Sequence, residues 1–157
     1  MARLTGILLV AAAAAGYAYF GFAALDERLK ELRKMMRALI YISSGVGCMQ
    51  PLESIFLHLS KTEGSIFDVF SADKSAEEIW RECVDKTALN TAEKNMFYPL
   101  GGCLGGADKT AQLKTIEMIL KNAEVTEREL EREIKKYLSA DMKLRLTMGI
   151  MVIILFI

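Results

Sequence analysis

Residues 100–110 read LGGCLGGADKT, with glycine at four of six consecutive positions and then a lysine and a threonine. A phosphate-binding loop of the type G-x-x-x-x-G-K-[ST] needs glycine directly before the lysine, so that backbone N–H groups can face the phosphates. Here Asp108 precedes Lys109 and Thr110, and its carboxylate would repel a phosphate at close range. No β-branched strand precedes the stretch either. The sequence therefore argues against a nucleotide site at this position.

A tight corner between two helices explains the same stretch better. Gly101 and Gly105 lie four residues apart near the end of one helix, where a missing side chain lets a neighbouring backbone approach. Gly105 and Gly106 can end that helix in the left-handed conformation. Asp108 can then cap the next helix by accepting hydrogen bonds from its first N–H groups. We therefore predict a structural corner.

The composition excludes several classes of protein. The chain has 157 residues, about one domain, of which 52% are apolar and 25% charged, with a net charge of zero. A nucleic-acid-binding protein normally has a basic surface, so we expect no nucleic-acid partner. Cys48, Cys83 and Cys103 form no C-x-x-C pair. We interpret them as small apolar residues in a reducing compartment.

Residues 1–25 are expected to form an N-terminal transmembrane segment. From Leu4 to Leu25 the chain has 22 residues without a charge, enough to cross a bilayer core of about 30 Å as a helix. A cleaved signal peptide is the alternative, because the run is rich in alanine. However, the run is longer than the apolar part of a signal peptide, and only Arg3 precedes it. Basic residues follow it, from Arg28 to Arg37, which places the next segment in the cytoplasm.

Residues 144–157, LRLTMGIMVIILFI, form a second and shorter apolar segment. From Leu146 it gives about 18 Å of uncharged helix, which is short for a membrane span. Arg145 can extend it by reaching toward the lipid headgroups. A buried core helix is the alternative, but the segment has no polar face for water. We expect a short C-terminal membrane segment, with residues 26–143 forming a cytoplasmic domain between the two.

Heptad-like patterns of apolar residues follow the first membrane segment and precede the second. The positions of the first are Phe22, Leu25, Leu29, Leu32, Met36, Leu39 and Ser43. The positions of the second are Leu113, Ile116, Leu120, Ala123, Glu127, Leu130, Ile134 and Tyr137. Because both helices are expected to meet the same membrane, they should run antiparallel and pack together as coiled stems. The charged stretch 126–136, which lies within the second pattern, is interpreted as a solvated helix face.

Three shorter helices are expected between the long ones. Pro51 suits the first position of a helix. Ser75 with Glu78 and Asn90 with Glu93 each match a capping box, the pattern that starts a helix. No alternating strand pattern is present. The fold class is therefore all-α: a cytoplasmic helical bundle with long antiparallel coiled stems.

These features together resemble the stage III sporulation protein AB family of endospore-forming bacteria, over nearly the whole chain. The shared features are the N-terminal anchor, the helix LKELRKMMRAL at residues 29–39, Pro51-Leu52 and the short apolar C-terminus. They include the corner motif Leu100, Gly101, Leu104, Gly105 and Asp108, with Gln112 four residues later. The corner also contains Gly102 and Gly106, in addition to the two glycines of the family motif. With these extra glycines, the sequence does not determine how flexible the corner is.

The resemblance implies a function. Family members look like the cytoplasmic helical domain of the type II secretion F protein and belong to the channel that links mother cell and forespore. The chain would then lie in the cell membrane, in the mother-cell membrane around the forespore. Its partners would be the ATPase of the channel and the other membrane proteins of the complex. A membrane-tethered helical adaptor of another type II secretion or type IV pilus-like system is the alternative.

The sequence contains no constellation of reactive groups. His58 is the only histidine, and IFLHLS places it among apolar residues. We expect no enzyme, cofactor, metal site or small-molecule substrate, so the protein should act through its surfaces. The expected partner contact is the charged face Glu77, Glu78, Arg81 and Asp85. Reversing the charges of Glu78 and Arg81 together should weaken ATPase binding and leave the helices intact.

Overall fold

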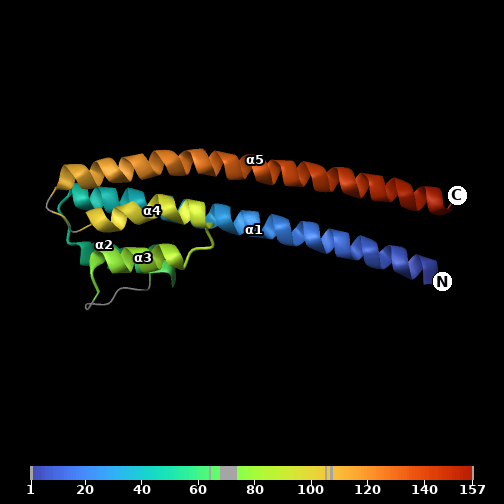
Figure 1. The fold of residues 1–157 in the computed structure, drawn as a ribbon, viewed down its shortest axis with the longest axis horizontal. Helices are drawn as coiled ribbons and strands as arrows, with labels where there is room; N and C mark the ends of the chain where they lie inside the picture. Colours follow the sequence, from blue (N-terminus) through green and yellow to red (C-terminus); the bar gives the residue numbers. More distant parts are fainter. Residues whose placement is uncertain (1, 64, 68–73, 105, 107, 157) are drawn as a thin grey trace. The chain divides into compact units, whose positions relative to one another are not determined.

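A computed structural model describes residues 2–63, 65–67, 74–104, 106 and 108–156. The side chains of residues 2–20, 65, 141–142, 144–146 and 148–156 lie outside this description. The described residues form five α-helices, one short 3-10 helix and no strand, which confirms the all-α fold (Figure 1). The elements are α1 (Ala2–Gly47), α2 (Leu52–Glu63), η1 (Ser65–Phe67), α3 (Ala76–Asp85), α4 (Thr91–Cys103) and α5 (Lys109–Phe156).

The chain divides into two compact units, which we describe separately. One unit comprises residues 28–128, and the other comprises residues 1–27 with 129–157. The sequence boundaries at 25/26 and 143/144 stay predictions.

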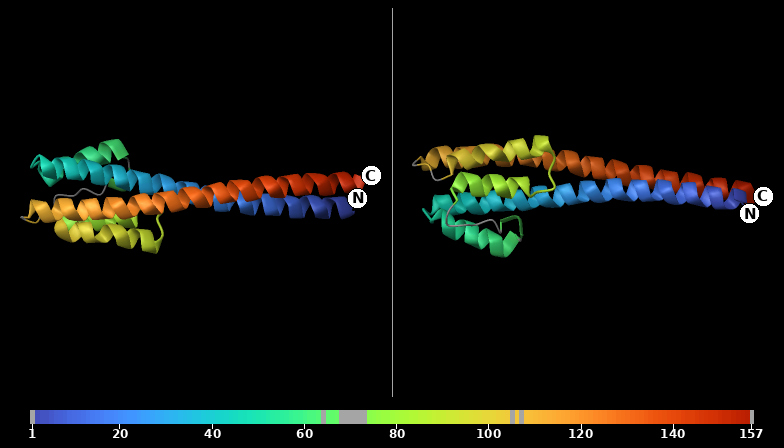
Figure 2. Two further views of the ribbon diagram at one scale, coloured as in Figure 1. Left: turned by 90° about the horizontal axis from the view of Figure 1, so that it is seen from above. Right: turned by 60° about the horizontal axis from the view of Figure 1, so that its bottom comes forward.

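In the unit 28–128, the end of α1 and the start of α5 run antiparallel (Figure 2). Arg33 Nε lies 2.6 Å from Glu127 Oε1, and Lys109 Nζ donates a 2.5 Å hydrogen bond to the carbonyl of Gly47. The earlier residue of α1, Arg33, thus contacts the later residue of α5, Glu127, and the later residue of α1, Gly47, contacts the earlier residue of α5, Lys109. This order is the one that antiparallel helices require. The antiparallel direction expected for the two long helices is confirmed within this unit, and their coiled packing stays a prediction.

The buried face of α1 differs from the predicted seam. Leu29, Leu32 and Leu39 are buried as expected, but Met36 and Ser43 are only half-buried. Met35, Ala38 and Ile42 are fully buried in their place. A straight α-helix has 3.6 residues per turn and drifts away from a strict seven-residue repeat. In addition, α1 has more than one neighbour, so its buried face is wider than a coiled-coil seam.

The connection from α1 to α2 is compact. The amide of Gln50 donates to the carbonyl of Gly45 at 2.9 Å, and Met49 adopts a positive φ of 58°. Pro51 lies one position before the helix rather than at its first position, and its carbonyl accepts from the amides of Ser54 and Ile55. A Cβ on Gly45 would collide with Ile55, so the glycine lets α2 approach α1 closely.

Both predicted capping boxes are confirmed. Ser75 and Glu78 exchange side-chain and backbone hydrogen bonds at the start of α3, and Asn90 and Glu93 do so at the start of α4. Each box satisfies backbone N–H groups that the first turn of a helix leaves without a partner.

Glu93 also joins α4 to α1. Its Oε1 lies 2.6 Å from Nη2 of Arg28, and the Glu93 side chain is 6% exposed. Burial removes most of the water around the Glu93 carboxylate, which costs free energy. The guanidinium of Arg28 and the backbone N–H of Asn90 offset this cost by donating hydrogen bonds to it. A second bond joins α3 to α4: Trp80 of α3 is fully buried, and its Nε1 donates to the carbonyl of Phe97 at 2.8 Å.

In the unit formed by residues 1–27 and 129–157, Leu25 and Leu130 are buried and Tyr137 approaches Gly21. Within the described residues, no helix combines the length and the apolar character needed to cross a membrane. The side chains of residues 1–20, and most of those in 144–157, lie outside the description. The two membrane segments therefore stay predictions.

We expect Glu93→Gln to destabilise the fold by about 2 kcal/mol, because the amide can still cap α4 but leaves Arg28 without its anion. Glu78→Gln is the matched control: it changes the same position of a capping box that is fully exposed, so its effect should be much smaller. Trp80, the only tryptophan of the chain, reports unfolding by fluorescence during urea titration of the full chain in detergent. Equal losses in both variants would contradict a role for the ion pair with Arg28.

Candidate functional site

The corner between α4 and α5 is built by the residues of the sequence motif. The amide of Leu104 donates to the carbonyl of Leu100 at 3.0 Å, which closes the last turn of α4. Leu104 itself is extended, and the amide of Gly106 donates to the carbonyl of Cys103 at 3.3 Å. Leu100 and Leu104 are buried. The chain thus leaves α4 abruptly, with two leucines anchored in the core.

Asp108 and Gln112 hold the other side of the corner. Asp108 Oδ1 accepts the amides of Thr110 and Ala111 at 2.9 and 3.1 Å, which is the predicted cap of α5. Gln112 is 6% exposed, and its Nε2 donates to the carbonyl of Gly106 at 2.8 Å. The buried amide of Gln112 thus has its hydrogen-bond partner within the corner, which is typical of a structural element.

Gly101 provides a close contact between α4 and α3. A Cβ at this position would lie 3.3 Å from Cγ of Glu77 and 3.4 Å from Cδ1 of Trp80. The absence of a side chain therefore lets Trp80 pack against α4. Gly105, the second glycine of the motif, lies outside the described residues.

Lys109 is the lysine that a phosphate-binding loop would have used. In the structure it joins the start of α5 to the end of α1 instead. Its hydrogen bond to Gly47 satisfies a carbonyl at the end of α1 and places a cation where a helix C-terminus favours one. Sequence reasoning missed this role because the two residues are 62 positions apart.

The predicted contact face on α3 is exposed, and each of its four side chains has an ion pair or a hydrogen bond within the protein. Arg81 Nη2 lies 3.6 Å from Glu77 Oε1, one turn away. Asp85 Oδ1 accepts the hydroxyl of Tyr98 at 2.5 Å, and this bond raises the pKa of Tyr98. The structure thus brings Glu77 and Arg81 together and directs Asp85 toward α4.

Glu78 has a different role from the other members of this face. Its Oε2 accepts the amide of Ser75 at 2.9 Å, and mainly because of this bond the pKa of the Glu78 carboxyl is below its usual range. A lysine at position 78 would lose the bond from the Ser75 amide, whereas the Ser75 hydroxyl could still accept the amide of residue 78. The double reversal at Glu78 and Arg81 should therefore weaken the start of α3, and its effect on ATPase binding stays a prediction.

Reactive side chains are scattered. His58 is exposed, contrary to the apolar setting expected from the sequence, and its ring stacks on Tyr41 with centroids 4.4 Å apart. The three cysteines are free; Cys48 is exposed, Cys103 half-buried and Cys83 buried, so the interpretation as small apolar residues fits Cys83 best and Cys48 least. In the part of the chain that the structure describes, no three His, Cys, Asp or Glu residues are grouped to hold a metal ion.

Comparison with known proteins gives a consistent picture. A family model described as stage III sporulation protein AB matches residues 3–157. A solved structure described as stage III sporulation protein AB (SpoIIIAB) matches with a TM-score of 0.61 and 23% sequence identity. The match covers 69% of this chain and 97% of that chain, and it shows a shared fold. No curated protein matches the chain significantly.

Substituting Gly101 with valine should destabilise the protein by about 2 kcal/mol, because the added methyl groups overfill the contact with Glu77 and Trp80. Gly102 is the matched control. It lies in the same helix and has nothing within 4 Å of its Cβ position, so Gly102→Val should change stability by less than about 0.5 kcal/mol. Thermal unfolding followed by circular dichroism compares the two variants. A larger loss at Gly102 than at Gly101 would refute this account of the α3–α4 contact.

The cysteines should differ in reactivity. Burial raises the pKa of Cys83 to about 12, and only the thiolate is nucleophilic, so at pH 8 this thiol stays protonated and shielded. We expect Cys48 to react with a maleimide at once and Cys83 only after unfolding. Mass spectrometry of timed samples distinguishes the sites, and addition of denaturant is the control. Equally fast native labelling of Cys83 would show that the α3–α4 core is open.

Proposed function

The chain belongs to the stage III sporulation protein AB family, as its sequence resemblance indicated, and from this we infer that it is a non-enzymatic structural component of a sporulation channel. The match to the family over residues 3–157 is the observation that carries the proposal. A role in sporulation follows from the family itself. The proposed channel is the secretion-like complex that links mother cell and forespore, and the protein would be required for endospore formation.

The arrangement of the polar residues supports a structural role. Asp108, Gln112 and Glu93 are used to cap helices and to hold them together. An enzyme usually keeps reactive groups of perturbed pKa together in a cleft. The proposed function instead relies on helical surfaces that partner proteins contact, without cofactor or small-molecule substrate.

Membrane attachment is part of the proposal and rests on the sequence. The uncharged run from Leu4 to Leu25 and the apolar segment 144–157 would hold the protein in the mother-cell membrane around the forespore. The basic residues between Arg28 and Arg37 would keep the intervening domain in the cytoplasm. There it would meet the ATPase of the channel and the other membrane proteins of the complex.

The test is affinity purification of the tagged full chain from detergent-solubilised membranes of sporulating cells. We expect the channel ATPase and further membrane proteins of the complex to co-purify. A strain without the protein should form at least about a hundredfold fewer heat-resistant spores, and the unsubstituted chain should restore them. A normal spore count in the deleted strain would refute the proposal. Co-purification with a pilus or secretion assembly of growing cells would favour the alternative of an adaptor in another system.

A further inference from the structure

Cationic side chains without a partner gather on one side of α5. In the described part of residues 28–128, most lysines and arginines have an ion pair or hydrogen bond within the protein. These are Arg28, Lys30, Arg33, Lys34, Arg37, Lys74, Arg81, Lys86, Lys94 and Lys109. The others are Lys61 on α2 and three residues of α5, Lys114, Lys121 and Arg128.

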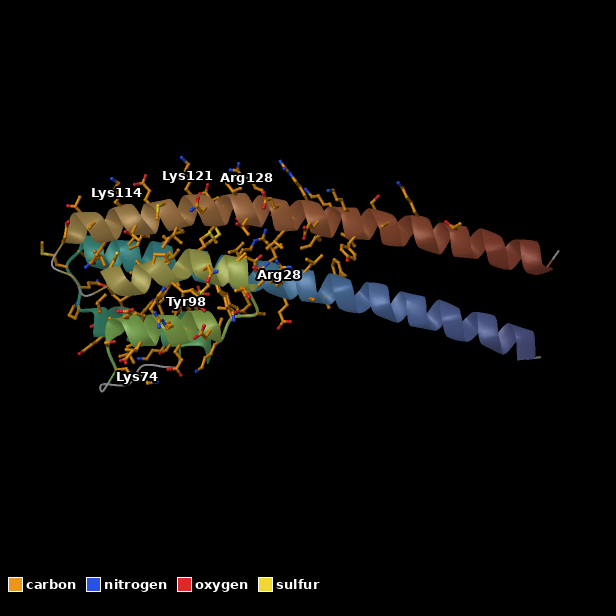
Figure 3. The ribbon with its side chains drawn as sticks, in the orientation of Figure 1. Arg28, Lys74, Tyr98, Lys114, Lys121 and Arg128 are labelled. Atoms are coloured by element: carbon orange, nitrogen blue, oxygen red, sulfur yellow. The ribbon has the colours of Figure 1, made fainter. Side chains whose placement is uncertain are left out.

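These three residues form a straight row, which we call the α5 basic row. They are seven residues apart, so they repeat every two turns and cover about 21 Å along the helix axis. All three are exposed. Figure 3 shows them on the same side of α5, pointing away from the other helices of this unit. The row is therefore accessible along its whole length.

Other side chains border the row. Met118 and Val125 lie on one side and are 55% and 53% exposed. Glu117 and Glu124 lie on the other side, are exposed, and make no ion pair with a described residue. The row with Met118 and Val125 thus combines positive charge with exposed apolar surface, a combination found in protein interfaces.

The α3 face lacks this combination. Glu77 pairs with Arg81, and Glu82 pairs with both Lys74 and Lys86. A partner that bound there would have to replace ion pairs that already exist, whereas at the α5 basic row it would add new ones. Exposed apolar side chains also accompany the row. Electrostatics therefore favours α5 over α3 as the contact surface.

We propose that the α5 basic row, with Met118 and Val125, docks an acidic amphipathic helix of a partner protein. Acidic residues spaced seven apart on that helix would face the three cations, and its apolar residues would cover Met118 and Val125. The proposal rests on the function inferred above and names the surface through which the channel partner is held. A lipid surface is a less suitable partner. The headgroups of a flat membrane could contact all three cations only if α5 lay parallel to the membrane.

Photo-crosslinking in sporulating cells tests the docking surface on the full chain. The photoreactive residue p-benzoylphenylalanine replaces Val125, and in a positional control it replaces Leu57, an exposed residue of α2. Cross-linked peptides are identified by mass spectrometry. A triple variant, Lys114→Gln, Lys121→Gln and Arg128→Gln, removes the charge and keeps good helix formers. Lys61→Gln is the matched control, since Lys61 is the other cation without a partner in the described part of residues 28–128 and lies on a different helix.

We expect Val125 to cross-link to a helical peptide with acidic residues seven positions apart. The yield should fall roughly tenfold in the triple variant, because three exposed ion pairs act together, and stay unchanged in Lys61→Gln. Both variants should keep the wild-type melting temperature, because the substituted side chains have no partner within the described residues. Cross-links to a second copy of this chain, to lipid, or to a peptide without acidic residues would overturn the proposal. So would the absence of cross-links, or a yield that the triple variant does not change.

Co-purification separates this inference from the proposed function. If the ATPase and membrane proteins still co-purify with the triple variant at full yield, the docking surface is wrong and the channel role stands. If they do not co-purify with the unsubstituted chain, the channel role itself is wrong.

Discussion

The packing of α1 against three other helices is the constraint on which the unit 28–128 depends. Each contact uses a different residue of α1. The pairs are Arg28 with Glu93 of α4, Arg33 with Glu127 of α5, and Gly45 with Ile55 of α2. Consequently Leu32, Met35, Ala38 and Leu39 are all fully buried within two turns. The remaining helix, α3, packs on α4 and η1, and its Trp80 donates to the carbonyl of Phe97 in α4.

Helix starts could be predicted from the sequence because capping is local. The capping boxes Ser75–Glu78 and Asn90–Glu93 each connect residues three positions apart, so the pattern and the interaction occupy the same short segment. The second function of Glu93, its ion pair with Arg28, bridges 65 positions and has no local signature. The bond from Lys109 to Gly47 is of the same kind.

The two predicted sites, the corner motif and the α3 face, could not be predicted equally well, because only the first depends on interactions between residues close in sequence. The corner motif could be located because its glycines and its cap are close in sequence, and Gln112 was included because the family resemblance pointed to it. The α3 face was predicted from its charged residues and from its place at the end of the domain expected to lie far from the membrane. Whether a charge is available depends on its neighbours in space, and in the structure Glu77 and Arg81 neutralise each other. The spacing of Lys114, Lys121 and Arg128 was readable from the sequence. That they have no partner among the described residues could be learned only from the structure.

The bonds that join α1 to α5 also affect the order of folding. The contacts of α3 with α4 and of α2 with η1 connect neighbours in the chain and close short loops. The pair Arg33–Glu127 closes a loop of 94 residues, which costs more chain entropy and forms more slowly. During synthesis, at roughly 5–20 residues per second, the apolar face of α1 emerges several seconds before Ile116 and Ile119 of α5. A nascent chain therefore exposes its longest apolar surface early. In that interval a chaperone or the membrane can protect it from aggregation.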